Sequence, residues 1–303
     1  MESDDIRSTD LLDGVSLRVL TGDARELLKT LPDESVNCCV TSPPYWGLRD
    51  YGHAGQLGLE RTPQEYVERM TEIFREVRRV LRGDGTLWLN LADSYNSQGG
   101  HSTPESDGRA NRVERQKMKG ANVAGLKTKD MIAVPWRTAL ALQSDGWYLR
   151  SDIIWAKPNP MPESVTDRPT KSHEYIFLLT KSERYYYDAD SIRESANGID
   201  ATRNKRTVWT ITPQPYREAH FATFPPDLVR PCVMAGCPVG GIVLDPFAGS
   251  GTTGMVALEL GRRTVLCELN PEYVKLINKR TNITEGFRLP SNAPHEPRGE
   301  SRP

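Results

Sequence analysis

No stretch of the sequence is apolar over the ~18 residues that a membrane helix needs, and no charged-then-apolar segment stands at its N-terminus. The sequence therefore predicts no membrane partner. Neither sign of charge is in excess, because 39 Lys and Arg balance 40 Asp and Glu among 303 residues, for a formal net charge of −1. This balance excludes a globally basic protein, so any surface for nucleic acid must be local.

Cysteine is scarce, and its spacing is not that of a metal site. The five cysteines, Cys38, Cys39, Cys232, Cys237 and Cys267, are odd in number and form no C-x-x-C pair. Such a pattern supports neither a disulfide framework nor a zinc site. We expect reduced thiols, a cytoplasmic location and no metal.

The composition is that of an ordinary globular protein, with 37% hydrophobic and 26% charged residues. We expect one catalytic domain over residues 15–284, between a loose leader (1–14) and a disordered tail (285–303). Residues 97–129 carry seven Lys and Arg against three acids and almost no apolar side chains, which predicts a basic insertion loop. A run of this kind is often only a solvated loop, so a binding role for it stays open.

Apolar runs alternate with amphipathic stretches along the chain. Expected strands are 16–20, 36–40, 86–91, 149–155, 175–180, 242–244 and 264–267, and expected helices are 62–81, 130–144, a helix from 226, 252–260 and 271–280. Helix 62–81 has the clearest signals, because Thr62 and Glu65 fit a capping box and Gly83-Asp84-Gly85 is expected to end it. The alternation predicts an α/β fold with a doubly wound, mostly parallel sheet.

One βαβ unit carries a glycine-rich turn, Gly249-Ser250-Gly251-Thr252-Thr253-Gly254, after the strand 242–244. The turn fits the G-x-G-x-x-G pattern, and Glu268 ends the next strand, where a ribose-binding acid is expected. Asp245 opposes a dinucleotide, because its carboxylate would face the pyrophosphate. S-adenosylmethionine has no phosphate and carries a positive amino group and a sulfonium, so an acid helps there. An NAD-binding fold and a turn without a ligand stay as alternatives.

The late position of this unit in the chain is also informative. Too few residues follow Glu268 to complete a doubly wound sheet, so the other strands must come from earlier in the chain. The strand 36–40 is then expected beside the strand 242–244, with both ending at the edge where open α/β sheets bind ligands.

The strand 36–40 runs into a rigid corner, Ser42-Pro43-Pro44-Tyr45. An exocyclic amino group on a nucleobase is a poor nucleophile, because its lone pair is delocalised into the ring. Two acceptors aimed at its N–H bonds, the Ser42 hydroxyl and the Pro43 carbonyl, would favour pyramidalisation and localise that pair. Tyr45 offers a face on which an extruded base can stack.

The early TSPPY and the late DPFAGSGTT motifs together resemble the permuted, β-class amino-methylating DNA methyltransferases. The resemblance extends to TGDA, NLADSY, DIIWAKPNPMPESVTDRP, HEYIFLLTKS and HFATFPPDLV, and covers most of residues 16–283. It implies a seven-stranded Rossmann-like sheet with circularly permuted motif order. It also implies S-adenosylmethionine as cofactor, double-stranded DNA as partner and a cognate restriction endonuclease as a candidate partner. In that family Ser-Pro-Pro-Tyr usually serves the 4-amino group of cytosine and Asp-Pro-Pro-Tyr the 6-amino group of adenine, so Ser42 favours cytosine.

The same matching implies roles for individual residues. The catalytic residues would be Ser42, Pro43, Pro44 and Tyr45. The cofactor-binding residues would be Asp23, Thr41, Phe221, Phe224, Pro225, Asp245, Pro246, Phe247, Gly249, Gly251, Thr252 and Glu268. The weaker candidates for DNA contact are Lys157 beside the flipped base, Arg112 and Arg115 in the basic loop, and Arg203, Lys205 and Arg206 in a recognition segment, 185–217. The implied mechanism is direct methyl transfer, after which the surplus proton leaves to solvent.

Three rivals stay open beside this interpretation. Pro231-Cys232 is the pair that ring-carbon methylation of cytosine would need, although it falls in an expected helix. Protein or RNA methyltransferases with a related corner usually carry the glycine turn first, which is the opposite order. A binding module without activity would require degenerate motifs, whereas these motifs are intact.

Overall fold

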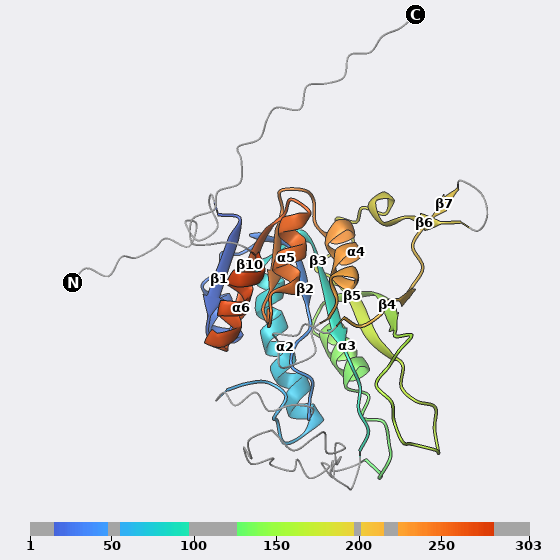
Figure 1. Cartoon of the computed structure of the whole chain (residues 1–303). Helices are drawn as coiled ribbons and strands as arrows, with labels where there is room; N and C mark the ends of the chain where they lie inside the picture. The colour runs from blue at the N-terminus through green and yellow to red at the C-terminus, as the bar shows by residue number, and fades with distance from the viewer. Residues whose placement is uncertain (1–14, 48–54, 97–125, 197–200, 215–223, 282–303) are drawn as a thin grey trace, which may run out of the picture.

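The computed structural model describes residues 15–47, 55–96, 126–196, 201–214 and 224–281 (Figure 1). The strands are β1 (Leu17–Thr21), β2 (Val36–Thr41), β3 (Leu81–Leu91), β4 (Tyr148–Ala156), β5 (His173–Thr180), β6 (Glu194–Ser195), β7 (Thr202–Arg203), β8 (Val208–Thr210), β9 (Ile242–Asp245) and β10 (Arg263–Glu268). The helices are α1 (Ala24–Lys29), α2 (Pro63–Val80), α3 (Val134–Ser144), α4 (Pro226–Gly236), α5 (Thr252–Glu259) and α6 (Pro271–Thr281), with a short 3-10 helix at Asp190–Ile192.

Several predictions concern residues outside this described part of the chain. They are the leader 1–14, the tail 285–303, Phe221, parts of the recognition segment 185–217, and most of the loop 97–129 with Arg112 and Arg115. Among the helices that the structure does describe, none has the length and apolar character needed to cross a membrane.

One sheet of eight strands, in the order β1-β10-β9-β2-β3-β5-β4-β8, organises the fold. Neighbouring strands from β1 to β3 are parallel, whereas β5 is antiparallel to both β3 and β4. The predicted doubly wound and mostly parallel sheet is confirmed, but the expected number of seven strands is wrong. The short β8 adds an eighth by pairing in parallel with the end of β4, and β6 and β7 form a separate two-stranded ribbon.

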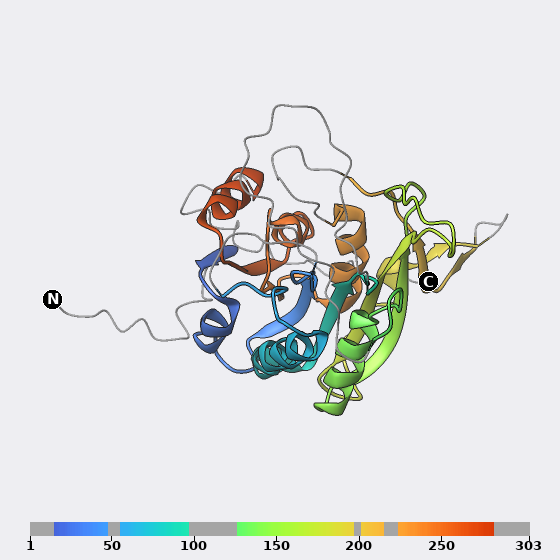
Figure 2. The ribbon, with the colours of Figure 1, turned by 90° about the horizontal axis from the view of Figure 1, so that it is seen from below.

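Helices cover both faces of this sheet. Figure 2 shows α1, α2 and α3 on one face and α4, α5 and α6 on the other. Central strands are therefore apolar on both sides, as buried parallel strands require. Cys39 and Leu244 belong to the core on the α2 side, while Cys38 and Val243 belong to the core on the α4 side. All five cysteines are buried and free, so they act as small hydrophobic residues.

Helix α2 begins as its sequence signals predict. Thr62 Oγ1 accepts a hydrogen bond from the Glu65 backbone N–H over 3.1 Å, and a proline occupies the first turn. The helix ends at Val80, before the glycines that were expected to stop it. Those glycines, at 83 and 85, lie inside β3, because pairing with β2 begins at Leu81.

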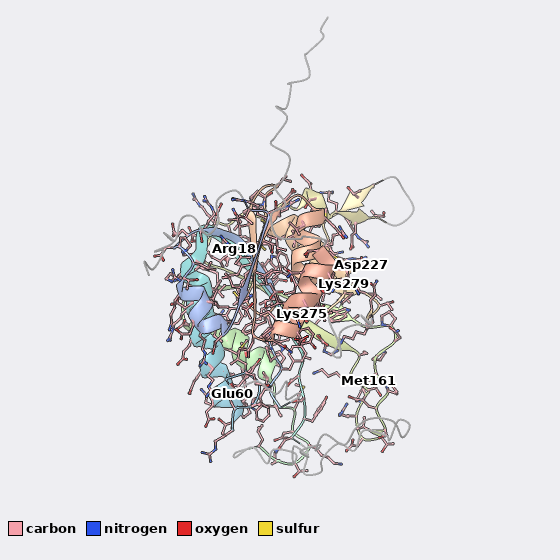
Figure 3. The ribbon with its side chains drawn as sticks, turned by 60° about the vertical axis from the view of Figure 1, so that its left-hand side comes forward. Arg18, Glu60, Met161, Asp227, Lys275 and Lys279 are labelled. Carbon is pink, nitrogen blue, oxygen red and sulfur yellow. The ribbon has the colours of Figure 1, made fainter. Side chains whose placement is uncertain are left out.

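The carboxyl ends of the parallel strands lie together at one edge of the sheet. The chain leaves β9 toward β10 through α5 and leaves β2 toward β3 through α2, and these helices lie on opposite faces. The chain direction therefore diverges between β9 and β2, which is where open α/β sheets bind ligands. Glu60, in the loop after β2, and Met161, in the loop after β4, mark this edge at the lower end of the molecule in Figure 3.

Candidate active site

A buried hydrogen bond joins the end of β2 to the end of β9. Thr41 Oγ1 donates to Asp245 Oδ1 over 2.7 Å, and the two residues are 1% and 0% exposed. The two strands are neighbours, with Cys39 opposite Leu244. The Ser42 corner begins one residue beyond Thr41 and the glycine turn begins four residues beyond Asp245, so the structure brings the two motifs to one edge.

Asp245 is completely buried, and three donors hold its carboxylate. Besides Thr41, the Thr253 hydroxyl donates to Oδ2 over 2.7 Å and the Phe247 backbone N–H donates to Oδ1 over 3.0 Å. Burial raises the pKa of Asp245 to about 6, and the three hydrogen bonds oppose that rise. Because its oxygens face protein donors, Asp245 can affect a ligand only through its buried charge.

The glycine turn uses left-handed backbone conformations at two positions. Gly249 has φ +51° and Gly251 has φ +80°. A Cβ on Gly251 would lie 3.0 Å from Ile277 Cγ1 of α6. Among the described atoms nothing lies within 4 Å of a Cβ position on Gly249, so a ligand can approach the backbone closely there.

Arg280 of α6 forms hydrogen bonds with two hydroxyls at the start of α5. Its Nη1 donates to Ser250 Oγ over 2.8 Å and to Thr252 Oγ1 over 2.9 Å. The Thr252 hydroxyl, expected among the cofactor contacts, therefore faces α6. Only the backbone of Thr252, at the N-terminus of α5, could then contact the cofactor.

Glu268 is the last residue of β10, the strand next to β9, which ends at Asp245. It is 8% exposed and accepts one backbone N–H on each oxygen, from Gly249 over 2.7 Å and from Asn270 over 2.8 Å. Burial raises the pKa of Glu268 to about 7, and the charge of Asp245 adds to the rise. Two such carboxylates favour a cationic ligand and oppose a pyrophosphate. These residues fit S-adenosylmethionine.

Other predicted cofactor residues also lie around this edge. Asp23 follows β1, caps α1 and has its pKa lowered by the guanidinium that it binds two residues later. Pro246 is buried, and Phe247 packs against the core on the α2 side. Pro225 occupies the N-cap position of α4, and Phe224 packs against the other core. Their roles toward a ligand stay predictions.

The Ser42–Tyr45 corner is held from two directions. Tyr66 Oη donates to the Pro44 carbonyl over 2.9 Å, and Ser42 Oγ lies 3.1 Å from Tyr45 Oη. Among the described residues no donor reaches the Pro43 carbonyl. Burial raises the pKa of the Tyr45 hydroxyl well above its ordinary value. Its hydroxyl is thus a neutral member of a buried network, and only its ring remains as a predicted stacking face.

A polar network continues from this corner to β3, β4 and β5. Tyr45 Oη lies 3.0 Å from Asn90 Oδ1 and 2.8 Å from Glu174 Oε2. Asn90 Nδ2 donates to Glu174 Oε2 over 3.1 Å and to a backbone carbonyl of β5 over 3.0 Å. Lys157 Nζ pairs with Glu174 Oε1 and lies 4.2 Å from the centroid of the Trp155 ring. Lys157, expected to contact DNA beside the base, is therefore a member of this network.

The basic residues of the predicted recognition segment lie elsewhere. Figure 1 shows the β6–β7 ribbon projecting on the β4 side of the sheet, away from β1 and β10. Arg203 and Arg206 donate to the same oxygen of Glu194, over 2.8 and 3.1 Å, and Lys205 lies 5.1 Å from the centroid of the Trp209 ring. The structure does not bring them to the corner, so their contact with DNA stays a prediction about a separate surface.

Cys232 does not have the surroundings of a nucleophile. It is 2% exposed inside α4, and its thiol donates to the Leu228 carbonyl over 3.3 Å. Burial raises the pKa of this thiol far above its ordinary value, whereas a reactive cysteine needs the thiolate. Within the described residues, no three His, Cys, Asp or Glu side chains are grouped to hold a metal.

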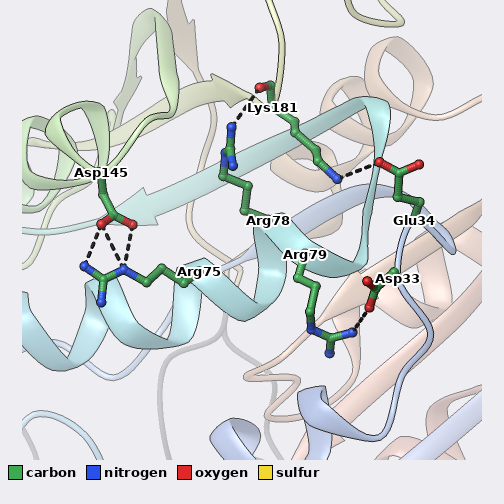
Figure 4. Close-up of a pocket in the computed structure, with 7 residues that line it drawn as sticks. All are labelled: Asp33, Glu34, Arg75, Arg78, Arg79, Asp145 and Lys181. Carbon is green, nitrogen blue, oxygen red and sulfur yellow. Dashed lines mark hydrogen bonds and ion pairs between the residues drawn. The ribbon is translucent and has the colours of Figure 1, made fainter.

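The opposite edge of the sheet carries a cavity of about 670 Å³ (Figure 4). Its lining is wholly charged and consists of Asp33, Glu34, Arg75, Arg78, Arg79, Asp145 and Lys181. Each carboxylate there pairs with a cation, at 2.5 Å for Asp33, 3.1 Å for Glu34 and 2.7 Å for Asp145. Each carboxylate of this lining therefore has a cation, in contrast to Asp245 and Glu268, while Arg78 donates to the Lys181 backbone carbonyl.

Comparison with known proteins identifies the family. Residues 36–279 match the model of the N6_N4_Mtase family, described as DNA methylase. The chain belongs to this family. The Type II methyltransferase M.SmaI of Serratia marcescens is 54% identical over 266 residues, which cover 88% of this chain and 90% of that protein. M.Cfr9I of Citrobacter freundii is 52% identical over 270 residues, which cover 89% and 88%. The NAD-binding alternative is therefore wrong.

Solved structures share the fold of this DNA methylase. The PvuII DNA methyltransferase, named as cytosine-N4-specific, superposes with a TM-score of 0.66 at 21% identity, over 90% of this chain and 88% of that chain. The putative DNA modification methylase TTHA0409 of Thermus thermophilus, complexed with S-adenosyl-L-methionine, has a TM-score of 0.60 at 26% identity, over 92% and 99%.

Two candidate functional residues of the methylase, Asn90 and Glu174, were missed from the sequence. Asn90 is 5% exposed and stands between two leucines in β3, so a polar residue within an apolar strand was the available signal. Glu174 is the second residue of β5, and nothing local distinguishes it from other charged residues at strand ends.

Proposed function

We propose that this DNA methylase transfers the methyl group of S-adenosylmethionine to the 4-amino group of a cytosine flipped out of duplex DNA. The observation that carries the proposal is the Thr41–Asp245 hydrogen bond, which fixes the Ser42 corner beside the glycine turn. Two adjacent strand ends then hold the acceptor nitrogen and the methyl donor in one geometry, which removes much of the entropic barrier.

The glycine-turn side of the edge supplies the cofactor site. S-adenosylmethionine, when bound, provides an electrophilic methyl group on a sulfonium. Asp245 and Glu268 favour its positive charge, and the remaining lone pairs of Glu268 suit the ribose hydroxyls. Gly249 permits close approach of the backbone. The likeness to TTHA0409 in complex with this ligand supports the choice.

The corner side supplies the site for the base. Ser42 Oγ and the Pro43 carbonyl accept the two N–H bonds of the amino group and localise its lone pair, while prolines keep the carbonyl aimed. A serine at this position supports cytosine, by the family pattern described for the sequence. The 6-amino group of adenine is the alternative target for the same geometry.

The relatives' Type II names support a place in a restriction-modification system. We expect duplex DNA as the partner, methylation within a short recognition sequence, and a cognate endonuclease that cuts the same sequence when it is unmethylated. The enzyme would then act on the DNA of its own cell, in the cytoplasm.

Nucleoside analysis tests the proposal. Purified protein is incubated with S-adenosylmethionine and duplex DNA, and the digested DNA is examined by mass spectrometry. N4-methyl-deoxycytidine is the expected product, also with Cys232→Ser. N6-methyl-deoxyadenosine would transfer the function to adenine, and 5-methyl-deoxycytidine would revive the Cys232 route. The absence of all three across DNA of random sequence would overturn the proposal.

A further inference from the structure

The hydrogens of the Tyr45 network are fixed by counting donors and acceptors. Tyr45 Oη lies within hydrogen-bond distance of Ser42 Oγ (3.1 Å), Asn90 Oδ1 (3.0 Å) and Glu174 Oε2 (2.8 Å). Asn90 presents Oδ1 to Tyr45, because its Nδ2 donates to Glu174 Oε2 and to a β5 carbonyl. An amide oxygen and an ionised carboxylate only accept, and a phenol has one proton.

The direction of the chain of hydrogen bonds follows from this count. Tyr45 has one hydroxyl proton, and two acceptors, Glu174 Oε2 and Asn90 Oδ1, already lie within hydrogen-bond distance of it. That proton is therefore not donated to Ser42. Ser42 must therefore donate to Tyr45 in their contact. Its lone pairs are then left for the N–H of an incoming amino group, which is the role that the proposed function requires of Ser42.

The surroundings of Glu174 favour its role as the hydrogen-bond acceptor of Tyr45. Its side chain is 12% exposed, and Lys157 neutralises it from the Oε1 side while Oε2 faces Tyr45. The other titratable groups that face Glu174 are Lys171, which precedes β5, and His173, which opens it and whose pKa is lowered by burial. The carboxylate is thus paired with a cation, largely enclosed and directed at Tyr45.

We propose that Ser42, Tyr45 and Glu174 form a proton relay, in which Glu174 is the terminal acceptor of the proton that the target amino group loses. The inference rests on the proposed function, because it needs an amino group at Ser42. It replaces the expectation that the proton leaves directly to solvent.

The relay balances in atoms and charge. When the N–C bond forms and the donor's S–C bond breaks, the amino nitrogen carries a positive charge and two protons. One of these protons passes to Ser42 Oγ as the Ser42 proton passes to Tyr45 Oη and the Tyr45 proton passes to Glu174 Oε2. The methylated base, Ser42 and Tyr45 end neutral, and Glu174 ends as a carboxylic acid that water deprotonates before the next turnover.

Glu174→Gln is the principal test, in single-turnover reactions with DNA and cofactor saturating. We expect a loss of about 100-fold in the rate of methyl transfer, the size typical for an acid–base group. The affinity for DNA should stay that of wild type, which a purely structural role would not allow, and the unfolding midpoint should fall only slightly, because Lys157 loses its partner. The wild-type rate should also fall more steeply on the acid side of its pH profile than the rate of the variant, in which Asp245 and Glu268 still titrate.

Tyr45→Phe supplies a second, independent variant, because it keeps the ring and interrupts the relay. We expect a similar loss, with no further loss in the double variant, since both changes break one chain. Glu163→Gln, the same change on an exposed carboxylate outside the network, is the matched control and should keep the wild-type rate. If Glu174→Gln does not fold, Glu174→Asp replaces it and should retain part of the rate.

Two results would overturn the relay. One is a wild-type rate in Glu174→Gln or its substitute, and the other is losses that multiply in the double variant. Both presuppose that the wild-type protein methylates an amino nitrogen, which the same assay measures. If it does not, the proposed function fails first, and the two failures remain distinguishable.

Discussion

The sheet edge at which β2, β9 and β10 end, called the active edge, has a glycine-turn half with Asp245 and Glu268 and a corner half with Tyr45 and Glu174. The two halves treat their enclosed carboxylates in opposite ways. In the glycine-turn half, the donors to Asp245 and Glu268 among the described residues are hydroxyls and backbone N–H groups. In the corner half, Glu174 has Lys157 as its counter-cation. A buried carboxylate without a cation is costly, whereas a paired one is partly compensated. The glycine-turn half therefore favours binding of a cationic ligand, whereas in the corner half Lys157 already balances the charge of the carboxylate.

Replacing Asp245 with Asn should produce the largest effect on this contrast. The amide fits, because the Thr253 hydroxyl can accept from it and turn its own proton to the Val40 carbonyl, 3.3 Å away. Loss of the negative charge should weaken S-adenosylmethionine binding by about 1–3 kcal/mol, or about 5- to 150-fold. The free energy of unfolding without ligand should stay equal or rise, because an uncompensated buried charge is removed.

Calorimetry and urea unfolding of Asp245→Asn measure these two quantities. Asp33→Asn, which alters a carboxylate paired with Arg79 at the opposite edge, is the control and should leave cofactor affinity unchanged. Unaltered affinity in Asp245→Asn would mean that the glycine-turn half does not act through its charge.

The second-largest expected effect is the change of cofactor affinity with pH. The pKa values of about 6 for Asp245 and about 7 for Glu268 are raised, so the folded state without ligand holds protons more tightly than the unfolded chain. These two groups therefore lower the stability as pH rises from about 4 to about 7, and a cationic ligand reverses this by favouring their ionised forms.

Cofactor affinity should consequently rise by about tenfold between about pH 5.5 and about pH 7.5, and the thermal shift that it produces should grow in parallel. Thermal unfolding with and without S-adenosylmethionine at the two pH values measures the effect. A shift that is constant over this range would contradict the assignment of the two carboxylates to the cofactor.

Lys157→Met tests the other half and should give a smaller effect of opposite sign to Asp245→Asn. Removing the cation leaves Glu174 enclosed without its partner, so the free energy of unfolding should fall by about 1 kcal/mol. The affinity for S-adenosylmethionine should not change, because Lys157 lies on the corner side. Chemical unfolding of both variants side by side compares the signs directly, and a stabilising Lys157→Met would remove the contrast.

The glycine-turn half was more predictable from sequence than the corner half, and the reason is chain locality. Gly249, Gly251 and Glu268 lie in one βαβ unit, and its late position was enough to place it beside β2. Asn90 and Glu174 are 84 residues apart and meet only because β3 pairs with β5 in one register. No local pattern encodes that pairing.

Other differences have equally specific physical causes. Strand β8 has only three residues and gains its structure from β4, so propensity alone gives it little signal. The glycines at 83 and 85 resemble a helix stop, but sheet pairing with β2 draws them into β3. In both cases a tertiary contact decides the local structure.

Arg75→Ala, at the opposite edge of the sheet, should have the smallest effect. It serves as a control for changes outside the active edge. Arg75 is an exposed partner of Asp145 in a cavity where every carboxylate has a cation, so solvent and salt screen the pair. We expect wild-type methyl transfer, wild-type cofactor affinity and an unfolding midpoint close to that of wild type. A loss of methyl transfer in this variant would show that the charged cavity of Figure 4 takes part in function, and the division of labour would then extend beyond the two halves of the active edge.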